Sequence, residues 1–254
     1  MSAANAEIAL NGIAYRNASD DPATGSTRDF TLTQIVDDGG TANGGADTGT
    51  PTGGTSSVTV QAVNDAPTLS VTAGSPTFTE GGASAAPFSG ASVDTVESGQ
   101  NVTGFTFTVS NLADGAAEIA VVDGTDIALT DTNSGTTAGN GLSYSVSVAG
   151  GTATVTLSGG TLTASAAQTV INAIAYRNDS DDPATGSSRD FTLTQIVDSG
   201  GTANGGDDTG TPSGGTASVT VQAVNDAPTL SVSADNPTFT EGGAAASPFS
   251  GATA

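Results

Sequence analysis

The sequence predicts an all-β protein built as a tandem repeat of antiparallel β-sandwich modules. Short segments in which apolar and polar residues alternate recur along the chain, as expected of half-buried strands. Loops rich in Gly, Asp, Asn and Thr separate these segments, and long helical patterns do not alternate with them, which favours packed antiparallel sheets. One long block of sequence also occurs twice at a fixed spacing, which indicates a repeat architecture.

The repeated block covers residues 13–91 and returns at residues 174–252, 161 positions later. Of the 79 aligned pairs, 68 are identical, as in a tandem array of similar domains. If V-N-D-A-P marks the junction between domains, residues 66–226 form one complete module. Residues 1–65 are then the C-terminal part of a preceding module, and residues 227–254 begin the next. The complete module is long enough to bury its own core, and we expect the natural array to be longer than this chain.

Three alternating segments give the clearest strand predictions, at residues 103–112, 142–148 and 152–157. Gly150 and Gly151 separate the last two segments. Because Gly readily takes the positive φ that a tight primed turn requires, this pair predicts a β-hairpin. The apolar residues expected to face inward are Phe105, Phe107, Val109, Leu142, Tyr144, Val146, Val148, Ala153, Val155 and Leu157.

Weaker patterns predict the remaining elements. One short helix is expected at residues 163–173, where Thr163 suits the N-cap and apolar residues recur at helical spacing. The module is larger than a minimal sandwich of ~100 residues, so the surplus is expected in long loops such as residues 198–216. Further strands are expected at residues 68–71, 77–79, 118–122, 127–130, 174–177, 189–197 and 217–224.

The composition excludes several classes of function. The chain has 26 Asp and Glu against four Arg, with no Lys and no His, giving a formal charge of −22. Such a surface repels nucleic-acid phosphates and anionic membranes and attracts cations, so nucleic-acid binding is excluded. The absence of Cys removes disulfides and thiolate chemistry, and no apolar run approaches the ~20 residues of a spanning helix, so we expect no membrane insertion. The regular alternation argues against the disorder that high acidity would otherwise suggest.

Catalysis is not expected. Without His, Cys or Lys, general-base and nucleophile roles are left to Asp, Glu, Ser, Thr and Tyr. The adjacent acids Asp20-Asp21 and Asp181-Asp182 could serve glycoside hydrolysis in principle, but they lie in Pro- and Gly-containing loops that recur with every module. Since a catalytic site is seldom copied in every unit of an array, we interpret the chain as a non-enzyme.

Calcium binding explains the acidic loops better than catalysis does. Ca²⁺ takes six to eight oxygens from carboxylates, Asn side chains and main-chain carbonyls, and loops rich in Asp, Asn and Gly can bring such oxygens together. The alternative for any single acid is a solvated turn residue. No EF-hand loop and no Gly-rich nonapeptide run is present. The candidate groups are the S-D-D-P loops, the loops after Asp37 and Asp198, the N-D of the junction, Glu80 or Glu241, and Asp94 with Glu97.

The chain resembles the cadherin-like, immunoglobulin-fold tandem repeats of large bacterial surface adhesins of the RTX type, many of which are exported by type I secretion. Four motifs carry the resemblance, and together they cover essentially the whole chain. They are A-V-N-D-A-P-T-L at 62–69 and 223–230, F-T-E-G-G at 78–82, L-T-A-S-A-A-Q-T-V-I-N-A-I-A-Y-R-N at 162–178 and D-S-G-G-T-A-N-G-G-D-D-T at 198–209.

The resemblance implies calcium between successive domains. Two departures point to one or two ions per seam rather than three. The family's linker D-x-N-D-N stands here as Ala62-Val63-Asn64-Asp65-Ala66, and its D-x-D is replaced by Asp94-Thr95-Val96-Glu97. The seam before the complete module would use Asp20 or Asp21, Asn64, Asp65, Asp94 and Glu97; the seam after it would use Glu80, Asp181 or Asp182, Asn225 and Asp226.

We therefore expect a structural extender repeat of a secreted or cell-surface bacterial adhesin, stiffened by Ca²⁺ at its seams. Its partners would be the neighbouring repeats of the same chain, with host-surface or matrix glycans bound through other domains. The alternative is a calcium-dependent carbohydrate-binding β-sandwich, which would need exposed aromatic residues. Tyr15, Tyr176 and the Phe residues instead fit core positions in strands.

Overall fold

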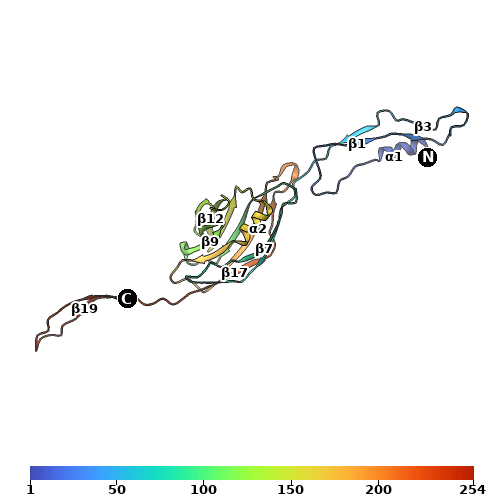
Figure 1. The fold of residues 1–254 in the computed structure, drawn as a ribbon. Coiled ribbons are helices and arrows are strands. Elements are labelled where there is room, and N and C mark those ends of the chain that lie inside the picture. Colours follow the sequence, from blue (N-terminus) through green and yellow to red (C-terminus); the bar gives the residue numbers. More distant parts are fainter.

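The computed structural model describes all 254 residues, and most of its regular structure is β (Figure 1). A central body lies between two extended terminal parts, with the N-terminal part at one end and the C-terminal part at the other (Figure 1). One cluster of 31 buried apolar residues forms the core, and all of it falls between Leu69 and Val221. The core therefore belongs to the region expected to be the complete module. Neither helix is long and apolar enough to cross a membrane.

The largest sheet has eight strands and forms one side of the central body. Seven of them follow the order β11-β12-β13-β8-β15-β17-β6, and β16 pairs with β15 beside this path. All pairs in the sheet are antiparallel except β17–β6, which is parallel, so the expectation of a purely antiparallel fold is wrong at this pair. The strands are β6 (Thr77–Thr79), β8 (Val102–Ser110), β11 (Ser134–Thr136), β12 (Ser143–Ala149), β13 (Thr152–Ser158), β15 (Arg189–Asp198), β16 (Thr209–Gly210) and β17 (Thr216–Gln222).

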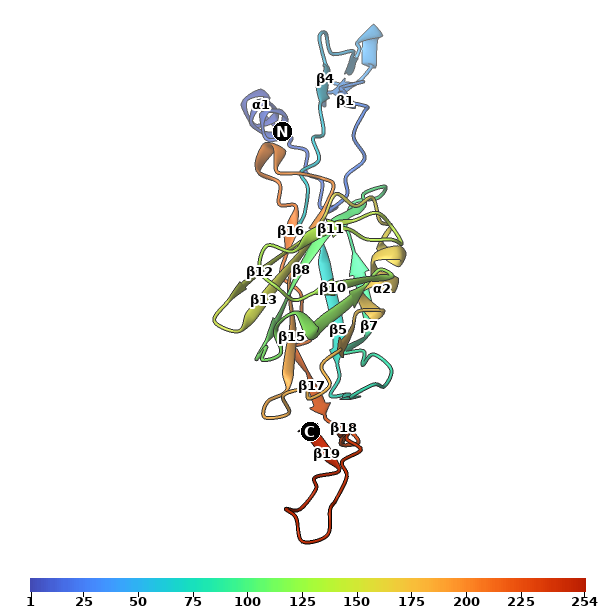
Figure 2. The same ribbon diagram turned by 90° about the vertical axis from the view of Figure 1, so that its left-hand side faces the viewer.

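Smaller sheets and one helix lie beside the large sheet (Figure 2). Helix α2 packs on β7, and the core cluster draws side chains from the large sheet, from the smaller sheets and from α2. Burial of apolar side chains from all of these elements stabilises the body. The elements are a three-stranded sheet of β10 (Thr125–Ala128), β9 (Glu118–Val122) and β14 (Ala175–Asn178), the pair β5 (Thr68–Ala73) and β7 (Phe88–Asp94), the 3₁₀ turn η2 (Gly115–Ala117) and α2 (Ala164–Asn172).

The strongest sequence predictions are confirmed. The segments β12 and β13 form an antiparallel hairpin, and both turn residues, Gly150 and Gly151, have positive φ, at 58° and 75°. The predicted inward residues of β8 and β13 are buried, as are Leu142 and Val146 of the hairpin. The helix is also confirmed, because the Thr163 side chain accepts a hydrogen bond from the N–H of Ala166 and caps α2.

Three strands were missed by the sequence patterns. β7 reads F-S-G-A-S-V-D, and small residues and a register shift opposite β5 break its alternation. β11 reads S-G-T and has no apolar residue at all. The expected long loop at residues 198–216 is wrong in part, because it contains the 3₁₀ turn η3 (Ala203–Gly205) and β16, which pairs with the end of β15. Such strands form because a partner strand is adjacent, which no local pattern reveals.

The two terminal parts contain regular elements but no buried residue. The strand pairs β1–β4 and β2–β3 are separate two-stranded sheets, and β18–β19 is a third. The elements are α1 (Ala3–Asn11), β1 (Arg28–Thr31), β2 (Ile35–Val36), the 3₁₀ turn η1 (Ala42–Gly44), β3 (Thr48–Gly49), β4 (Thr55–Val58), β18 (Ser231–Ala234) and β19 (Phe249–Thr253).

Candidate metal centre at the N-terminal seam

Asn64 organises the junction that precedes the complete module. Its Nδ2 donates to Asp198 Oδ1 at 3.2 Å and to the Asp207 carbonyl at 2.7 Å, and its Oδ1 accepts from Gln100 Nε2 at 2.5 Å. A Cβ atom on Gly200 would collide with this carboxamide, so the loop after β15 reaches Asn64 because Gly occupies that position. The junction residue thus joins two loops that lie far apart in the sequence.

Further contacts cross the same junction. The N–H of Asp65 donates to Glu97 Oε1 at 2.8 Å, and the N–H of Ser98 donates to Asp21 Oδ2 at 3.1 Å. Asp21 belongs to the preceding partial module, Asp65 to the junction and Glu97 to the complete module. All three regions therefore meet at one place. We call the following residues the seam cluster: Asp21, Asn64, Asp65, Glu97, Gln100 and Asp198.

Three oxygen atoms of the seam cluster are buried and have no hydrogen-bond partner. They are Glu97 Oε2, Gln100 Oε1 and Asp198 Oδ2, and they are the only such side-chain atoms in the protein. Glu97 is 8% exposed and Asp198 is 3% exposed. A buried polar atom without a partner costs about 1–3 kcal/mol, and more when it is charged. Because all three atoms are acceptors, a cation would satisfy them, and carboxylate and amide oxygens suit Ca²⁺.

The electrostatics of Asp198 also favour a cation. Burial raises the pKa of this carboxyl, while hydrogen bonds from the N–H of Gly200 and from Asn64 lower it. The negative charges of Asp208 and Asp207 raise the pKa further. The charged form of Asp198 is thus held at a cost, which a bound cation would offset. Asp21 behaves differently, because the hydrogen bond from the main chain of Ser98 lowers its pKa.

The backbone beside Glu97 is strained. Val96 has a φ of 63°, in the left-handed region that a β-branched residue rarely occupies. The Asp94 carboxylate accepts from the N–H of Val96 at 3.0 Å, and the N–H of Glu97 donates to the carbonyl of Thr95 at 2.7 Å. Such strain persists only where the surroundings impose it, and it is concentrated at ligand clamps and functional sites. Here it fixes the direction of the chain into Glu97.

The structure brings together only part of each predicted ligand set. In the N-terminal set, Asp65 contacts Glu97 directly, while Asn64 contacts Gln100 and Asp198 and Asp21 contacts the main chain of Ser98. Asp20 is exposed and Asp94 closes its own turn. In the C-terminal set, Glu80 Oε2 accepts from the N–H of Val224 at 2.7 Å, Asn225 donates to the Asp226 carbonyl, and Asp181 and Asp182 are exposed. No three acidic side chains come close enough to share an ion, so an ion here would also need amide, main-chain or water oxygens.

Two residues of the seam cluster were not predicted as ligands. Asp198 lies in a loop that the sequence singled out, and it precedes a Gly-Gly pair in both copies of the repeat, as Asp37 and Asp198. Its position directly after the predicted strand at residues 189–197 was the signal that could have identified it as a ligand. Gln100 has no equivalent elsewhere in this chain, so nothing in the sequence distinguished it from other loop amides.

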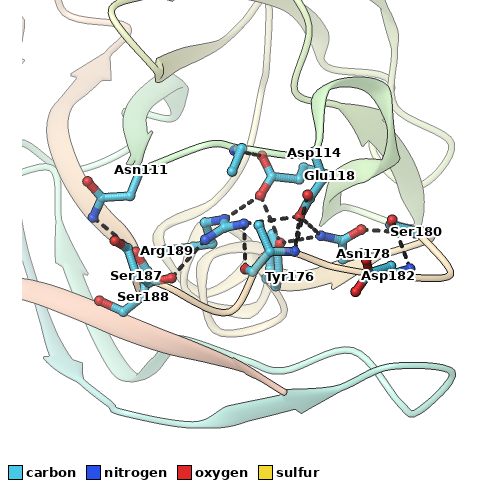
Figure 3. Close-up of polar contacts among 12 residues, drawn as sticks. Asn111, Asp114, Glu118, Tyr176, Asn178, Ser180, Asp182, Ser187, Ser188 and Arg189 are labelled. Carbon is cyan, nitrogen blue, oxygen red and sulfur yellow. Dashed lines mark hydrogen bonds and ion pairs between the residues drawn. The ribbon is translucent and has the colours of Figure 1, made fainter. Parts of the chain in front are cut away.

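A buried ion-pair network joins Arg189, Glu118 and Asp114, none of which belongs to the seam cluster (Figure 3). Arg189 is 1% exposed and forms ion pairs with Glu118, which is fully buried, and with Asp114 at 3.1 Å. Burial lowers the pKa of Arg189, but its hydrogen bond to Glu118 and the charges of Glu118, Tyr176 and Asp114 outweigh burial and raise it. Burial and the charge of Glu118 raise the pKa of Tyr176 far above its usual value. Both side chains therefore keep one protonation state across the physiological range.

This network holds the S-D-D-P loop against the body. Arg189 donates to the carbonyls of Ser187 at 2.8 Å and Ala184 at 3.2 Å, and Asp114 accepts from the N–H of Ala184 at 3.0 Å and from Asn178 at 2.6 Å (Figure 3). The sequence already carried a signal, since the alternation along β15 places Arg189 on the same face as the core residues of that strand. A buried Arg requires acidic partners, and the network supplies them.

A second arginine pairs with acids in one copy of the repeat and not in the other. Arg177 forms ion pairs at 2.9 Å with Asp126 and Asp179, and its pKa is raised, chiefly by the hydrogen bond to Asp179. Its equivalent Arg16 forms no ion pair.

No family model, curated protein or solved structure matches this chain.

Proposed function

We propose that this chain is a segment of an extracellular extender array, in which tandem immunoglobulin- or cadherin-like β-sandwich modules are braced by Ca²⁺ at their seams. The observation that carries the proposal is the set of three partnerless buried oxygens, in Glu97, Gln100 and Asp198, at a junction between repeats. The sandwich assignment is supported by the single core shared between the large sheet and the smaller sheets. The adhesin role and the location at a bacterial surface follow from the family resemblance.

Ca²⁺ at the seam would be held by Glu97, Gln100 and Asp198. The carboxylate of Asp21, in the preceding module, accepts from the N–H of Ser98, which follows Glu97 directly. An ion in the seam cluster would therefore connect two modules. A bound ion supplies positive charge where acids from both modules and from the junction converge. Without it, repulsion among these acids loosens the joint, and with it the joint becomes stiffer and the module more stable.

The module has little of what a carbohydrate-binding surface requires. All of its Phe residues and Tyr176 are buried, and Tyr144 is half-buried. Sugar rings are usually bound by stacking on exposed aromatic faces, whereas these rings pack against one another, as Phe191 does with Phe107. The extender proposal therefore has more support than the alternative.

Calorimetric unfolding of residues 1–254, with millimolar Ca²⁺ and with chelator, tests the proposal. At 100 times the dissociation constant, one ion would stabilise the folded state by about 2.7 kcal/mol. For a module of this size, that corresponds to a rise of about 5–10 °C in the transition temperature. Small-angle scattering should also show a stiffer, more extended particle with Ca²⁺ than with chelator.

Two variants locate the effect. Glu97→Gln should lose most of the gain with Ca²⁺, while Glu7→Gln, which removes one exposed acid outside both predicted ligand sets, should keep it. An unchanged transition temperature in the wild-type chain would remove Ca²⁺ from the proposal. A full response in Glu97→Gln would place the ion somewhere other than the seam cluster.

A further inference from the structure

The three partnerless oxygens of the seam cluster share one pattern, in which the junction holds the other polar atom of each side chain. Asn64 Nδ2 donates to Asp198 Oδ1 at 3.2 Å, which leaves Oδ2 free. Gln100 Nε2 donates to Asn64 Oδ1 at 2.5 Å, which leaves Oε1 free. The N–H of Asp65 donates to Glu97 Oε1 at 2.8 Å, which leaves Oε2 free. Two neighbouring residues of the junction therefore orient all three side chains.

The junction itself is packed against the loop between β15 and β16, at the end of the central body nearer the N-terminal part (Figure 2). Asn64 Nδ2 donates to the carbonyl of Asp207 at 2.7 Å, and the carbonyl of Asn64 accepts from the N–H of Asp207 at 2.9 Å. A Cβ atom on Gly206 would lie 3.0 Å from the Asn64 Cβ, and one on Gly210 would collide with the Pro67 carbonyl. Residues 64–67 thus form a docked junction on the module that follows them.

The free oxygens and the residues that orient them come from different parts of the repeat. The oxygens belong to the complete module, since Glu97 and Gln100 lie in the loop between β7 and β8 and Asp198 ends β15. Asn64 and Asp65 precede that module. If the junction left its place, each of the three side chains would lose the hydrogen bond that orients it.

We propose that docking of the junction and binding of the cation are coupled, with Asn64 as the positioning residue of the site. The inference rests on the proposed function, because it takes the three free oxygens as ligands of Ca²⁺. The Asn64 carboxamide already bonds to Gln100, Asp198 and the main chain of Asp207, so it orients ligands instead of binding the ion. This role differs from the direct ligation that the family resemblance implies for Asn64.

The coupling acts in both directions. If the docked junction raises the affinity for Ca²⁺ by a given factor, bound Ca²⁺ favours the docked junction by the same factor. The covalent connection to the preceding module runs through the junction, so a load along the array reaches Asn64 before it reaches the core. Such a load would weaken Ca²⁺ binding, and bound Ca²⁺ would resist it. Ca²⁺ would therefore stiffen the joint by holding the junction in place as well as by offsetting acidic charge.

Calorimetric titration of the full chain with Ca²⁺ tests the role of Asn64. Asn64→Ala should weaken the affinity by about 10–100-fold, as is usual when a group that orients metal ligands is removed. Asn133→Ala is the matched control, because it also removes a partly buried carboxamide, whose Nδ2 donates to the Ala128 carbonyl at 2.8 Å. This control should keep the wild-type affinity. Circular dichroism checks that both variants are folded.

Asn64→Asp distinguishes a positioning residue from a direct ligand. A carboxylate is a favoured ligand of Ca²⁺, so an Asp that binds the ion directly should raise the affinity. We expect the opposite, because Asp cannot donate to Asp198 and to the Asp207 carbonyl as Asn64 does. Tighter binding by Asn64→Asp than by the wild-type chain would overturn the positioning role.

Hydrogen exchange of the wild-type chain tests the coupling without any variant. The N–H groups of Asp65 and Asp207 bond across the docked junction, to Glu97 and to the Asn64 carbonyl. Exchange at both should be slower with Ca²⁺ than with chelator. The N–H of Gly139, which donates to the Asp123 carbonyl at 3.0 Å, should change little and serves as the control.

The outcomes separate this inference from the proposed function. Wild-type affinity in Asn64→Ala would overturn the inference, and so would exchange at Asp65 and Asp207 that Ca²⁺ leaves unchanged. In both cases the calcium-braced array would stand. A wild-type chain that binds no Ca²⁺ would overturn the inference and the proposed function together.

Discussion

Phe191 and Phe30 occupy the same position of the repeat, yet one is fully buried and the other is 39% exposed. Phe191 is stacked against Phe107 and meets Phe88 and Tyr176 edge-on, whereas Phe30 meets only Tyr15. The sequences around the two residues are nearly identical. The difference therefore comes from partners supplied by residues 66–161, and it separates what is local in this fold from what is not.

Local structure survives in the partial copy. Asn43 and Asn204 have almost the same left-handed conformation, with φ of 57° and 58°. Arg28 keeps the two loop carbonyl contacts that Arg189 makes, with Ser26 at 2.9 Å and Ala23 at 2.8 Å, although it has no acidic partner. Turns and loop contacts thus depend on a few neighbouring residues, and they form without the core.

Long strands do not survive in the same way. β15 runs continuously over ten residues in the module, where β8 pairs with it along most of its length. Its counterpart in the partial copy is divided into β1 and β2, of four and two residues. A strand needs partners on its edges and a buried face, and the partial copy offers neither a β8 nor a core.

Substituting the equivalent Phe in each copy should give the largest difference in stability between the two regions. Phe191→Ala should destabilise the complete module by about 3–5 kcal/mol, because it leaves a cavity among stacked rings. Phe30→Ala should leave the unfolding of the module unchanged. Urea unfolding followed by circular dichroism, in dilute solution, measures both. Similar losses in the two variants would mean that the partial copy belongs to the cooperative unit.

Arg189 and Arg28 occupy equivalent positions of the repeat, and their substitution should give a difference in stability of comparable or slightly smaller size. Arg189→Ala should cost about 3–5 kcal/mol, because it leaves the buried carboxylate of Glu118 without its charge partner. Arg28→Ala should change stability by no more than about 0.5 kcal/mol, as for an ordinary surface substitution. The same unfolding assay distinguishes them. An Arg189→Ala variant as stable as the wild type would show that the Glu118 carboxylate does not need Arg189 as its charge partner.

The helix caps provide a smaller difference. Thr163 Oγ1 accepts from Ala166 N at 3.2 Å, and Ser2 Oγ accepts from Asn5 N at 3.3 Å. Thr163→Ala should lower the stability of the module by about 0.5–2 kcal/mol. Ser2→Ala should have no effect on it, since α1 buries no residue. Thermal unfolding of the two variants, compared with the wild-type chain, decides whether α2 is coupled to the core.

The smallest expected effect concerns Asp198 and pH. Burial raises its pKa in the folded state, so its contribution favours folding below the unfolded pKa and is lost as the pH rises through the folded pKa. In chelator at neutral pH, Asp198→Asn should therefore slightly raise the transition temperature, while it should reduce the gain with Ca²⁺. Asp37→Asn, the exposed equivalent, serves as the control. A loss of stability in chelator would contradict the assigned sign.

The sequence alone determined the repeat, the hairpin at Gly150 and Gly151, the capped helix at Thr163 and the set of strands with clear alternation. Each of these depends on residues close together in the chain, so a local pattern carries the information. It also identified the acidic junction, and Asn64, Asp65 and Glu97 do lie together there.

Only the tertiary structure decided which strands form without an apolar pattern and which oxygens at the seam lack partners. β11 and β7 form because β12 and β5 lie beside them. Gln100 and Asp198 both bond to Asn64 because the pairing of β8 with β15 brings them to the same end of the sheet, although they are nearly a hundred positions apart. Burial and partner choice depend on contacts across such distances. Residues 66–91 and 174–226 have those contacts in the complete module, whereas their counterparts at 227–252 and 13–65 do not.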